Sequence, residues 1–155
     1  MKAVYAGSFD PYTNGHKSIL KDAADIFEEV HVIIGVNSAK KRSFDAEKMK
    51  AAIEEDLKKE GINNCKVVIF TGLIALYCKD NGIRCLVRGL RNDMDYNYEE
   101  NIAEVNARIN PNIKSIYLRA EDRAISSSMV RELLMYDQDV SAYVPDSVLN
   151  LIKNR

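Results

Sequence analysis

The residues whose types and spacing could do chemistry begin directly after the first apolar run. Residues 2–6 (KAVYA) are short, apolar and β-prone, and they lead into the segment GSFDPYTNGH, which ends at His16. Gly7 and Gly15 permit close approach of the backbone to an anion, and the start of a following helix presents unpaired N–H groups to it. The segment lacks the Gly-Lys-Ser/Thr ending of a Walker loop and the three-glycine spacing of a dinucleotide fingerprint. The pattern therefore predicts nucleotide handling through a different phosphate turn.

His16 stands where a bound phosphate would lie. It could stabilise charge that develops on an α-phosphate, either as a protonated ring or through a neutral N–H. The alternative, which is the more common one for an isolated histidine, is a capped and partly buried side chain with no chemical function.

Basic residues follow two later apolar runs. The run Lys40–Arg42 could neutralise phosphate, although such a run is more often a solvated loop. Arg88 and Arg91 come immediately after the apolar residues 83–87, and arginine suits bidentate phosphate recognition. We expect these two arginines to lie at a strand end and to contact an anion.

A serine turn offers a second anion site. Ser126–Ser128 place hydroxyls and free backbone amides at a predicted helix start, and Arg131 adds a cation one turn later. An ordinary serine cap is an equal alternative. For the polar and aromatic residues of the preceding predicted helix, packing or solvent exposure is the simpler explanation; these are Tyr96, Tyr98, Glu99 and Asn106.

Alternating strands and helices must position these residues. Short β-branched runs predict further strands at 30–36, 66–70, 83–87 and 114–118. Helical spacing predicts helices over 16–27, 46–60, 73–81 and 93–109, a shorter one from the serine turn, and a last one after Pro145. This alternation predicts an α/β fold, a doubly wound parallel sheet of five strands with helices on both faces and ligands at the carboxyl ends of the strands.

Composition limits the class of protein. The 155 residues fit a single domain, 1–155, and 22 Lys and Arg against 23 Asp and Glu give a net charge of −1. This balance argues against a nucleic-acid partner. Three irregularly spaced cysteines indicate reduced thiols rather than disulfides or a zinc site. No apolar run has the length of a signal peptide or a membrane span, so we expect a soluble, cytoplasmic protein without a membrane partner.

These motifs together resemble the phosphopantetheine adenylyltransferase family of the nucleotidyltransferase superfamily. Residues 13–16 (TNGH) match the T/S-x-G-H signature and residues 125–128 (ISSS) recur in the superfamily, whereas residues 87–99 (VRGLRNDMDYNYE) distinguish this family. The resemblance runs over nearly the whole chain. It implies a Rossmann-like nucleotidyltransferase fold and transfer of the adenylyl group of ATP to 4′-phosphopantetheine, which forms dephospho-coenzyme A and pyrophosphate in coenzyme A biosynthesis.

The resemblance also implies roles for individual residues. It implies a catalytic set of His16, Lys40, Arg88 and Arg91. It implies substrate binding by Ser8, Lys40, Ile74 and Arg88. It implies ATP binding by Ser8, Phe9, His16, Gly89, Leu90, Arg91, Glu99, Asp122, Arg123, Ala124, Ile125, Ser126, Ser127 and Ser128. Two positions depart from the family pattern: Asp122-Arg123 stand where some members carry an aromatic-containing segment, and Ser8 replaces a threonine while preserving the hydroxyl.

The implied reaction needs no strong general base, because a phosphate monoester with a second pKa of about 6 is already ionised near neutral pH. Lys40 and Arg88 would hold this nucleophile, His16 would face the α-phosphate, and Arg91 with the serine turn would hold the β- and γ-phosphates. Mg²⁺ would accompany ATP through phosphate oxygens and water, since the sequence shows no carboxylate cage.

The resemblance further implies a homohexamer and coenzyme A as a feedback inhibitor. The alternatives are another nucleotidyltransferase, acting on nicotinamide mononucleotide or using CTP, and a non-catalytic nucleotide sensor.

Overall fold

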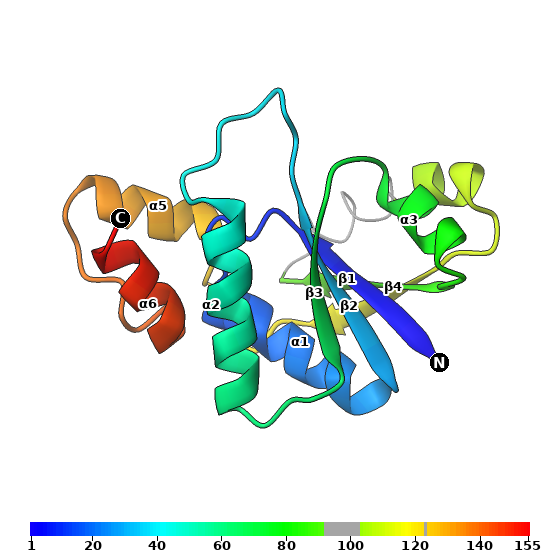
Figure 1. Cartoon of the computed structure of the whole chain (residues 1–155), viewed down its shortest axis with the longest axis horizontal. Helices are drawn as coiled ribbons and strands as arrows, with labels where there is room; N and C mark the ends of the chain where they lie inside the picture. Colours follow the sequence, from blue (N-terminus) through cyan, green and yellow to red (C-terminus); the bar gives the residue numbers. More distant parts are fainter. Residues whose placement is uncertain (92–102, 123) are drawn as a thin grey trace.

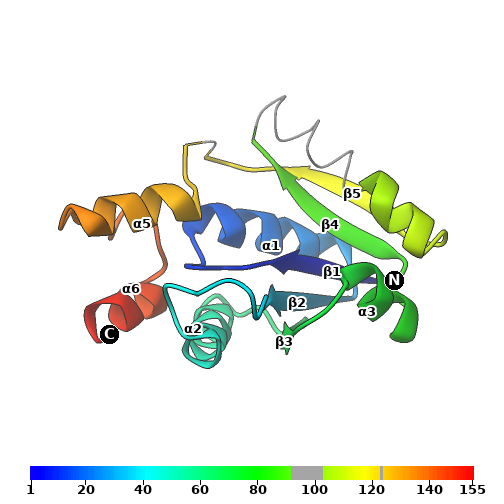
Figure 2. The same cartoon turned by 90° about the horizontal axis from the view of Figure 1, so that it is seen from above.

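A parallel five-stranded sheet forms the centre of the computed structural model, which describes residues 1–91, 103–122 and 124–155. The strand order is β3-β2-β1-β4-β5 (Figure 1, Figure 2). The strands are β1 (Lys2–Gly7), β2 (Glu29–Gly35), β3 (Cys65–Phe70), β4 (Cys85–Leu90) and β5 (Lys114–Arg119). The predicted doubly wound α/β fold with five strands is therefore confirmed.

The helices follow the predicted alternation. They are α1 (Asn14–Ile26), α2 (Ala46–Lys59), α3 (Ile74–Asp80), α5 (Ser127–Met135) and α6 (Asp146–Lys153), and residues 103–109 are also helical. Only this last part of the helix predicted over 93–109 is described, and Tyr96, Tyr98 and Glu99 lie outside the described residues. None of the helices within the described ranges is long and apolar enough to cross a bilayer.

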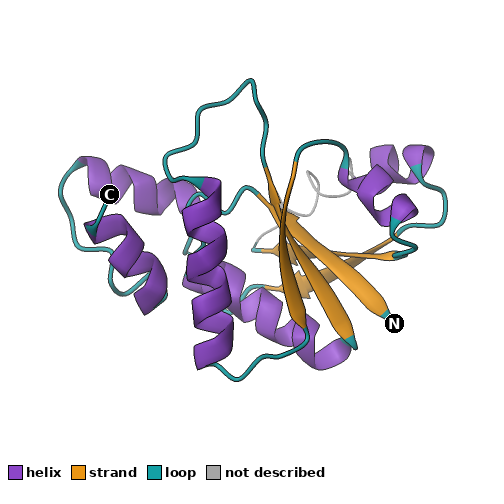
Figure 3. Cartoon of the chain, viewed as in Figure 1, coloured by secondary structure: helices purple, strands orange, loops and turns teal. Residues whose placement is uncertain are grey.

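Both faces of the sheet are covered (Figure 3). Successive side chains of a strand point to opposite faces. Ala3 and Tyr5 of β1 therefore belong to a core cluster with residues of α1, α2, α5 and α6, whereas Val4 packs in a second cluster with Tyr77 and Cys78 of α3. Burial on both sides explains why the strands read as continuous apolar runs rather than as an alternating pattern.

The topology creates a switch point between β1 and β4. The chain builds outward from β1 to β2 and β3, and then returns to place β4 on the other side of β1. Because Tyr5 is level with Val87 in this pair, the residues that follow each of them emerge side by side at the carboxyl edge. A crevice at such a point is where ligands bind in open α/β sheets.

The boundaries predicted for β4 were wrong. The strand begins at Cys85 and continues through Leu90, because its pairing with β5 extends to the Leu90–Arg119 register. Arg88 and Gly89 thus lie within the strand rather than after it. Polar character in residues 88–91 suggested a loop, but the ladder with β5 depends on backbone groups and tolerates these side chains.

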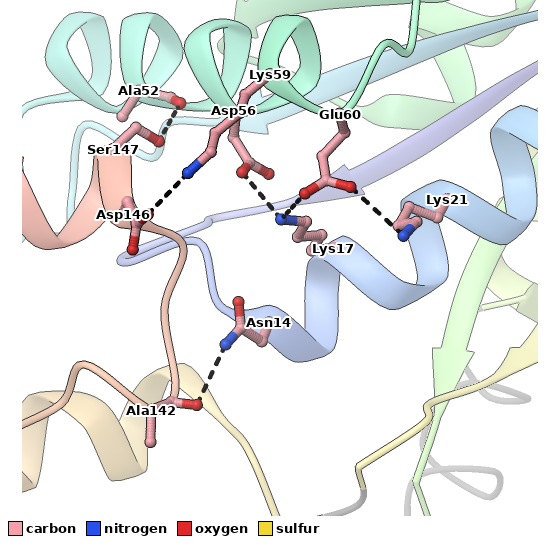
Figure 4. A network of polar contacts seen from close by, with 10 residues as sticks. All are labelled: Asn14, Lys17, Lys21, Ala52, Asp56, Lys59, Glu60, Ala142, Asp146 and Ser147. Atoms are coloured by element: carbon pink, nitrogen blue, oxygen red, sulfur yellow. Dashed lines mark hydrogen bonds and ion pairs between the residues drawn. The ribbon is translucent and has the colours of Figure 1, made fainter.

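Polar contacts tie α1 to α2 and α2 to α6 on one face of the sheet (Figure 4). Lys17 Nζ lies 3.0 Å from Asp56 Oδ1 and 2.7 Å from Glu60 Oε1. Ser147 of α6 donates through its hydroxyl to the carbonyl of Ala52 in α2 at 2.7 Å. These contacts fix the direction of α1, whose first turn carries His16.

Candidate active site

A cavity of about 330 Å³ opens where the carboxyl ends of β1 and β4 meet the starts of α1 and α5. It brings together these predicted site residues: Ser8, Phe9, His16, Arg88, Gly89, Arg91, Ile125, Ser126, Ser127 and Ser128. The rest of the lining is Tyr5, Ala6, Gly7, Thr13, Gly15, Ile19 and Ala120. Motifs separated by more than a hundred positions in the chain therefore meet at the switch point, as the topology requires.

The ring of His16 is held in one orientation by the first turn of α1. Thr13 is the N-cap: its hydroxyl accepts from the His16 N–H at 3.4 Å, and its backbone N–H donates to His16 Nδ1 at 3.0 Å. Because a backbone N–H can only donate, Nδ1 is the acceptor and the ring proton lies on Nε2. Phe9 packs edge-on against the imidazole, and Tyr12 stacks on it. His16 can therefore offer a fixed Nε2–H donor to a group in the cavity.

His16 is neutral at physiological pH. Burial, together with the positive charge of Arg91, lowers the pKa of His16 from 6.5 to about 4. The sequence left a charged ring and a neutral N–H donor equally open, and the structure favours the neutral donor. Such a donor can stabilise developing negative charge without binding a proton itself.

The turn after β1 is held by Asp10, which sequence reasoning did not single out. The carboxylate of Asp10 is buried and accepts the backbone N–H groups of Ser43 and Phe44, each at 2.8 Å. Phe9, one residue earlier, has a left-handed φ of 44° and a ring that is 1% exposed. The aspartate in the pattern F-D-P was visible, but its partners lie more than thirty residues away and gave no local signal.

The serine turn caps α5 and also meets the turn after β1. Ser126 accepts the N–H of Met129 at 3.1 Å, so the alternative of an ordinary cap describes this residue. Ser127 donates its hydroxyl to the Pro11 carbonyl at 2.7 Å. Arg131, the cation one turn after the serines, donates to the Asp10 carbonyl at 2.6 Å. The two candidate anion sites are therefore parts of one rigid wall.

Another part of the lining comes from β4 and the residue that follows it. Arg88 and Arg91 line the cavity, and Gly89 between them lets α1 approach the sheet, since a Cβ there would lie 3.1 Å from Ile19 Cγ1. Both arginines line the same cavity as His16, and the charge of Arg91 acts on the His16 ring. This placement agrees with the expectation that they contact an anion, while their individual roles remain predictions.

Several predicted site residues do not line this cavity as the structure describes it. They are Lys40, Ile74, Leu90, Asp122 and Ala124. Lys40 is exposed in the segment between β2 and α2, and Ile74 packs against the core cluster on the other face of the sheet. Glu99 and Arg123 lie outside the described residues. The functions expected of all seven stay predictions.

The described lining of the cavity consists of cationic, hydroxyl and apolar groups. Within the described residues, the cavity wall holds arginines, hydroxyls and a histidine donor but no carboxylate, and no cluster of three or more His, Cys, Asp or Glu side chains could hold a metal. Hard cations such as Mg²⁺ prefer oxygen ligands and retain water, and phosphate groups supply such ligands. Binding of Mg²⁺ together with ATP stays a prediction.

Comparison with known proteins agrees with the resemblance to nucleotidyltransferases. Residues 4–133 match the model of the family described as cytidylyltransferase-like. A curated relative from Streptococcus pneumoniae (strain CGSP14), named phosphopantetheine adenylyltransferase, is 42% identical over 154 residues, which cover 97% of this chain and 94% of the relative.

Solved structures share the fold at low sequence identity. A putative nicotinate-nucleotide adenylyltransferase from Vibrio parahaemolyticus superposes with a TM-score of 0.73 and 18% identity, covering 99% of this chain and 91% of the other. The nicotinic acid mononucleotide adenylyltransferase of Plasmodium falciparum, complexed with NaAD, gives a TM-score of 0.72 and 14% identity, with coverages of 99% and 94%. These likenesses concern the fold alone.

Proposed function

The chain belongs to the cytidylyltransferase-like family, and within it to the phosphopantetheine adenylyltransferases, and from this premise we propose that it transfers the adenylyl group of ATP to 4′-phosphopantetheine. The products are dephospho-coenzyme A and pyrophosphate. The observation that carries the proposal is the cavity at the switch point, whose described lining combines a neutral His16 donor with Arg88 and Arg91 and contains no carboxylate. Such groups stabilise negative charge on phosphorus.

The chemistry agrees with these groups. A phosphate oxygen of the acceptor forms a bond to the α-phosphorus of ATP, and the bond from that phosphorus to the bridging oxygen breaks, so the electron pair leaves on pyrophosphate. The acceptor is already ionised near neutral pH, because its second pKa is about 6. The protein therefore has to bring two anions together and neutralise the charge that accumulates between them.

We assign roles to the described residues on this basis. The Nε2–H of His16 donates to the α-phosphate, and this hydrogen bond strengthens as charge builds up. Arg91 and the amides of the turn at Ser126 hold the β- and γ-phosphates. Arg88 holds the acceptor phosphate, and Lys40 approaches it from the exposed segment after β2.

Further properties belong to the same proposal. Mg²⁺ enters with ATP as part of the substrate and is held by phosphate oxygens and water. We also propose a cytoplasmic location, a homohexamer and feedback binding of coenzyme A. Exposed apolar side chains support an assembly of copies, among them Leu73 and Leu76 on the side of α3 and Val105 of the helix 103–109.

An acceptor panel tests the reaction. Purified protein is incubated with Mg-ATP and either 4′-phosphopantetheine, nicotinate mononucleotide, nicotinamide mononucleotide or no acceptor, and pyrophosphate release is followed with mass detection of the product; CTP replaces ATP in a parallel series. We expect dephospho-coenzyme A with ATP and phosphopantetheine only.

The other outcomes identify the alternatives. Turnover of a nicotinic or nicotinamide nucleotide would keep the fold and the mechanism but replace the acceptor. Binding of ATP without turnover of any acceptor would favour a nucleotide sensor.

A further inference from the structure

Arg42 makes an unusual set of contacts for a residue in a basic run. Its side chain is only 15% exposed. Nη1 donates to the Ser8 carbonyl at 2.7 Å, Nη2 to the Phe9 carbonyl at 3.3 Å, and Nε to the Phe44 carbonyl at 2.9 Å. Nη2 also lies 3.8 Å from the Asp10 carboxylate. The guanidinium is thus committed to the turn after β1, and it is not part of the cavity lining.

These contacts determine which way the peptide units of the turn face. In a trans peptide unit the carbonyl and the N–H point in opposite directions. A Ser8 carbonyl directed at Arg42 therefore turns the Phe9 N–H away from Arg42, and the Phe9 carbonyl does the same for the Asp10 N–H. Neither N–H donates to another group in the described part of the chain. Successive N–H groups around a left-handed residue form a concave anion site, and Phe9 is such a residue.

Arg42 and Asp10 form a reciprocal clamp between the turn after β1 and the segment before α2. While Arg42 holds the carbonyls of the turn, the Asp10 carboxylate holds the N–H groups of Ser43 and Phe44 at 2.8 Å each. Each segment fixes the other, and the aspartate offsets the charge of the guanidinium. A lysine could not replace this arrangement fully, since an ammonium is a point donor whereas the guanidinium is a rigid, planar fork.

The same clamp anchors the exposed basic segment. Lys40 precedes Arg42 by two residues, so their backbones are separated by at most about 7 Å. A mobile segment would spread the Lys40 ammonium over a large volume, whereas an anchored one holds it beside the turn. Arg42 thus fixes both the turn after β1 and the backbone that carries Lys40.

We propose that Arg42 is a positioning residue for ATP, which holds the amides of Phe9 and Asp10 toward the bound phosphates without touching the nucleotide. The inference rests on the proposed function for the identity of the reaction, but its effect on nucleotide binding can be measured alone. Loss of the clamp releases the turn, and ATP affinity falls because the binding-competent conformation is then populated only part of the time.

The test compares Arg42→Ala and Arg42→Lys with Arg84→Ala. Arg84 is exposed directly before β4, at the opposite edge of the sheet, so its substitution removes the same charge without touching the turn. The Kd for Mg-ATP is measured by calorimetry without an acceptor, kcat and KM are measured with 4′-phosphopantetheine, and Tm is recorded for every variant. We expect Arg42→Ala to raise Kd about tenfold or more, Arg42→Lys to give an intermediate value, and Arg84→Ala to match the wild type.

Steady-state kinetics should show the same pattern, with the KM for ATP rising more than kcat falls. An unchanged Kd in Arg42→Ala, or an equal loss in Arg84→Ala, would overturn the inference. If Arg42→Ala does not fold, the test depends on Arg42→Lys. A Kd for Mg-ATP in Arg42→Lys equal to that of the wild type would refute the role of the guanidinium.

Two results separate this inference from the proposed function. If the wild-type protein binds Mg-ATP but transfers no adenylyl group to any acceptor, the proposed reaction is refuted. The Kd values of the variants for Mg-ATP would still test the role of Arg42. Wild-type protein that does not bind Mg-ATP would refute both.

Discussion

At His16 a single local hydrogen bond selects the chemical form of the side chain. The backbone N–H of Thr13 occupies Nδ1, so the ring presents Nε2–H and stays neutral. Thr13 was not predicted to be the N-cap, since the helix was expected to begin at residue 16 rather than at Asn14. The tautomer and the lowered pKa could not be predicted, because they depend on burial and on Arg91, 75 positions further along the chain.

His16→Ala should reduce kcat about 10²- to 10³-fold while changing the Kd for Mg-ATP much less, since the hydrogen bond strengthens as charge develops. Single-turnover kinetics and calorimetry measure the two quantities. His31→Gln is the matched control, because His31 is buried away from the cavity and contacts Tyr77 and Glu29. Equal losses of kcat in the two variants would remove His16 from the mechanism.

The pKa of His16 also predicts how stability depends on pH. Its value of about 4 in the folded protein lies below the value of 6.5 for a free histidine, so the unfolded state binds more protons between these values. The contribution of His16 to the free energy of unfolding is complete above pH 6.5 and is lost as the pH falls toward 4.

NMR titration of the imidazole checks the pKa directly, and urea unfolding at several pH values checks its effect on stability. In His16→Gln the free energy of unfolding should fall less steeply between pH 6.5 and 4. A titration midpoint near 6.5, with the same slope in both proteins, would contradict the buried neutral ring.

At the scale of elements, α1 must be held against α2 for His16 to face the cavity. Lys17 carries most of this link. Burial alone would lower the pKa of Lys17, but hydrogen bonds to Glu60 and Asp56 outweigh it and raise the pKa above its usual value. Asp56 is 4% exposed, so removal of Lys17 would leave a buried carboxylate without its counter-ion.

Lys17→Met should therefore lower the free energy of unfolding by about 3 kcal/mol, as expected for breaking a buried ion pair. Lys21→Met is the control: Lys21 is half exposed and its Nζ lies 3.5 Å from Glu60 Oε2, so its loss should change stability by less than about 1 kcal/mol. Urea denaturation measures both. Equal effects would show that the buried link to Asp56 does not stabilise the helix pair.

The elements themselves were largely predictable, because buried parallel strands read as short apolar runs and the amphipathic helices between them keep their spacing. The prediction failed at the end of β4, where polar residues continue a strand whose length is set by pairing with β5. It did not predict the contacts of Asp10 and Arg42, which join segments more than thirty positions apart. Local patterns carry no information on such partners.

At the scale of the whole molecule, topology explains why distant motifs share a cavity. Parallel strands put all their carboxyl ends on one edge, and the reversal of strand order opens a crevice between β1 and β4. The sequence therefore predicted the convergence of the turn after β1, the arginines and the serine turn. It did not predict that Ile74 packs on the far face, because side-chain direction in a first helical turn depends on the final packing. The exposure of Lys40 agrees with the alternative of a solvated loop.

The charge of the cavity lining differs from the net charge of the whole chain. The chain as a whole carries a net charge of −1, yet the described cavity wall presents arginines without any carboxylate. Such a local concentration of positive charge would attract polyphosphates.

The most direct test of adenylyl transfer follows the oxygen atoms. The protein is incubated with Mg-ATP and 4′-phosphopantetheine whose phosphate oxygens carry ¹⁸O, and the products are analysed by mass spectrometry. Attack on the α-phosphorus should leave all of the label in dephospho-coenzyme A and none in the released pyrophosphate. Label in the pyrophosphate, or formation of ADP with a doubly phosphorylated acceptor, would contradict adenylyl transfer at this cavity.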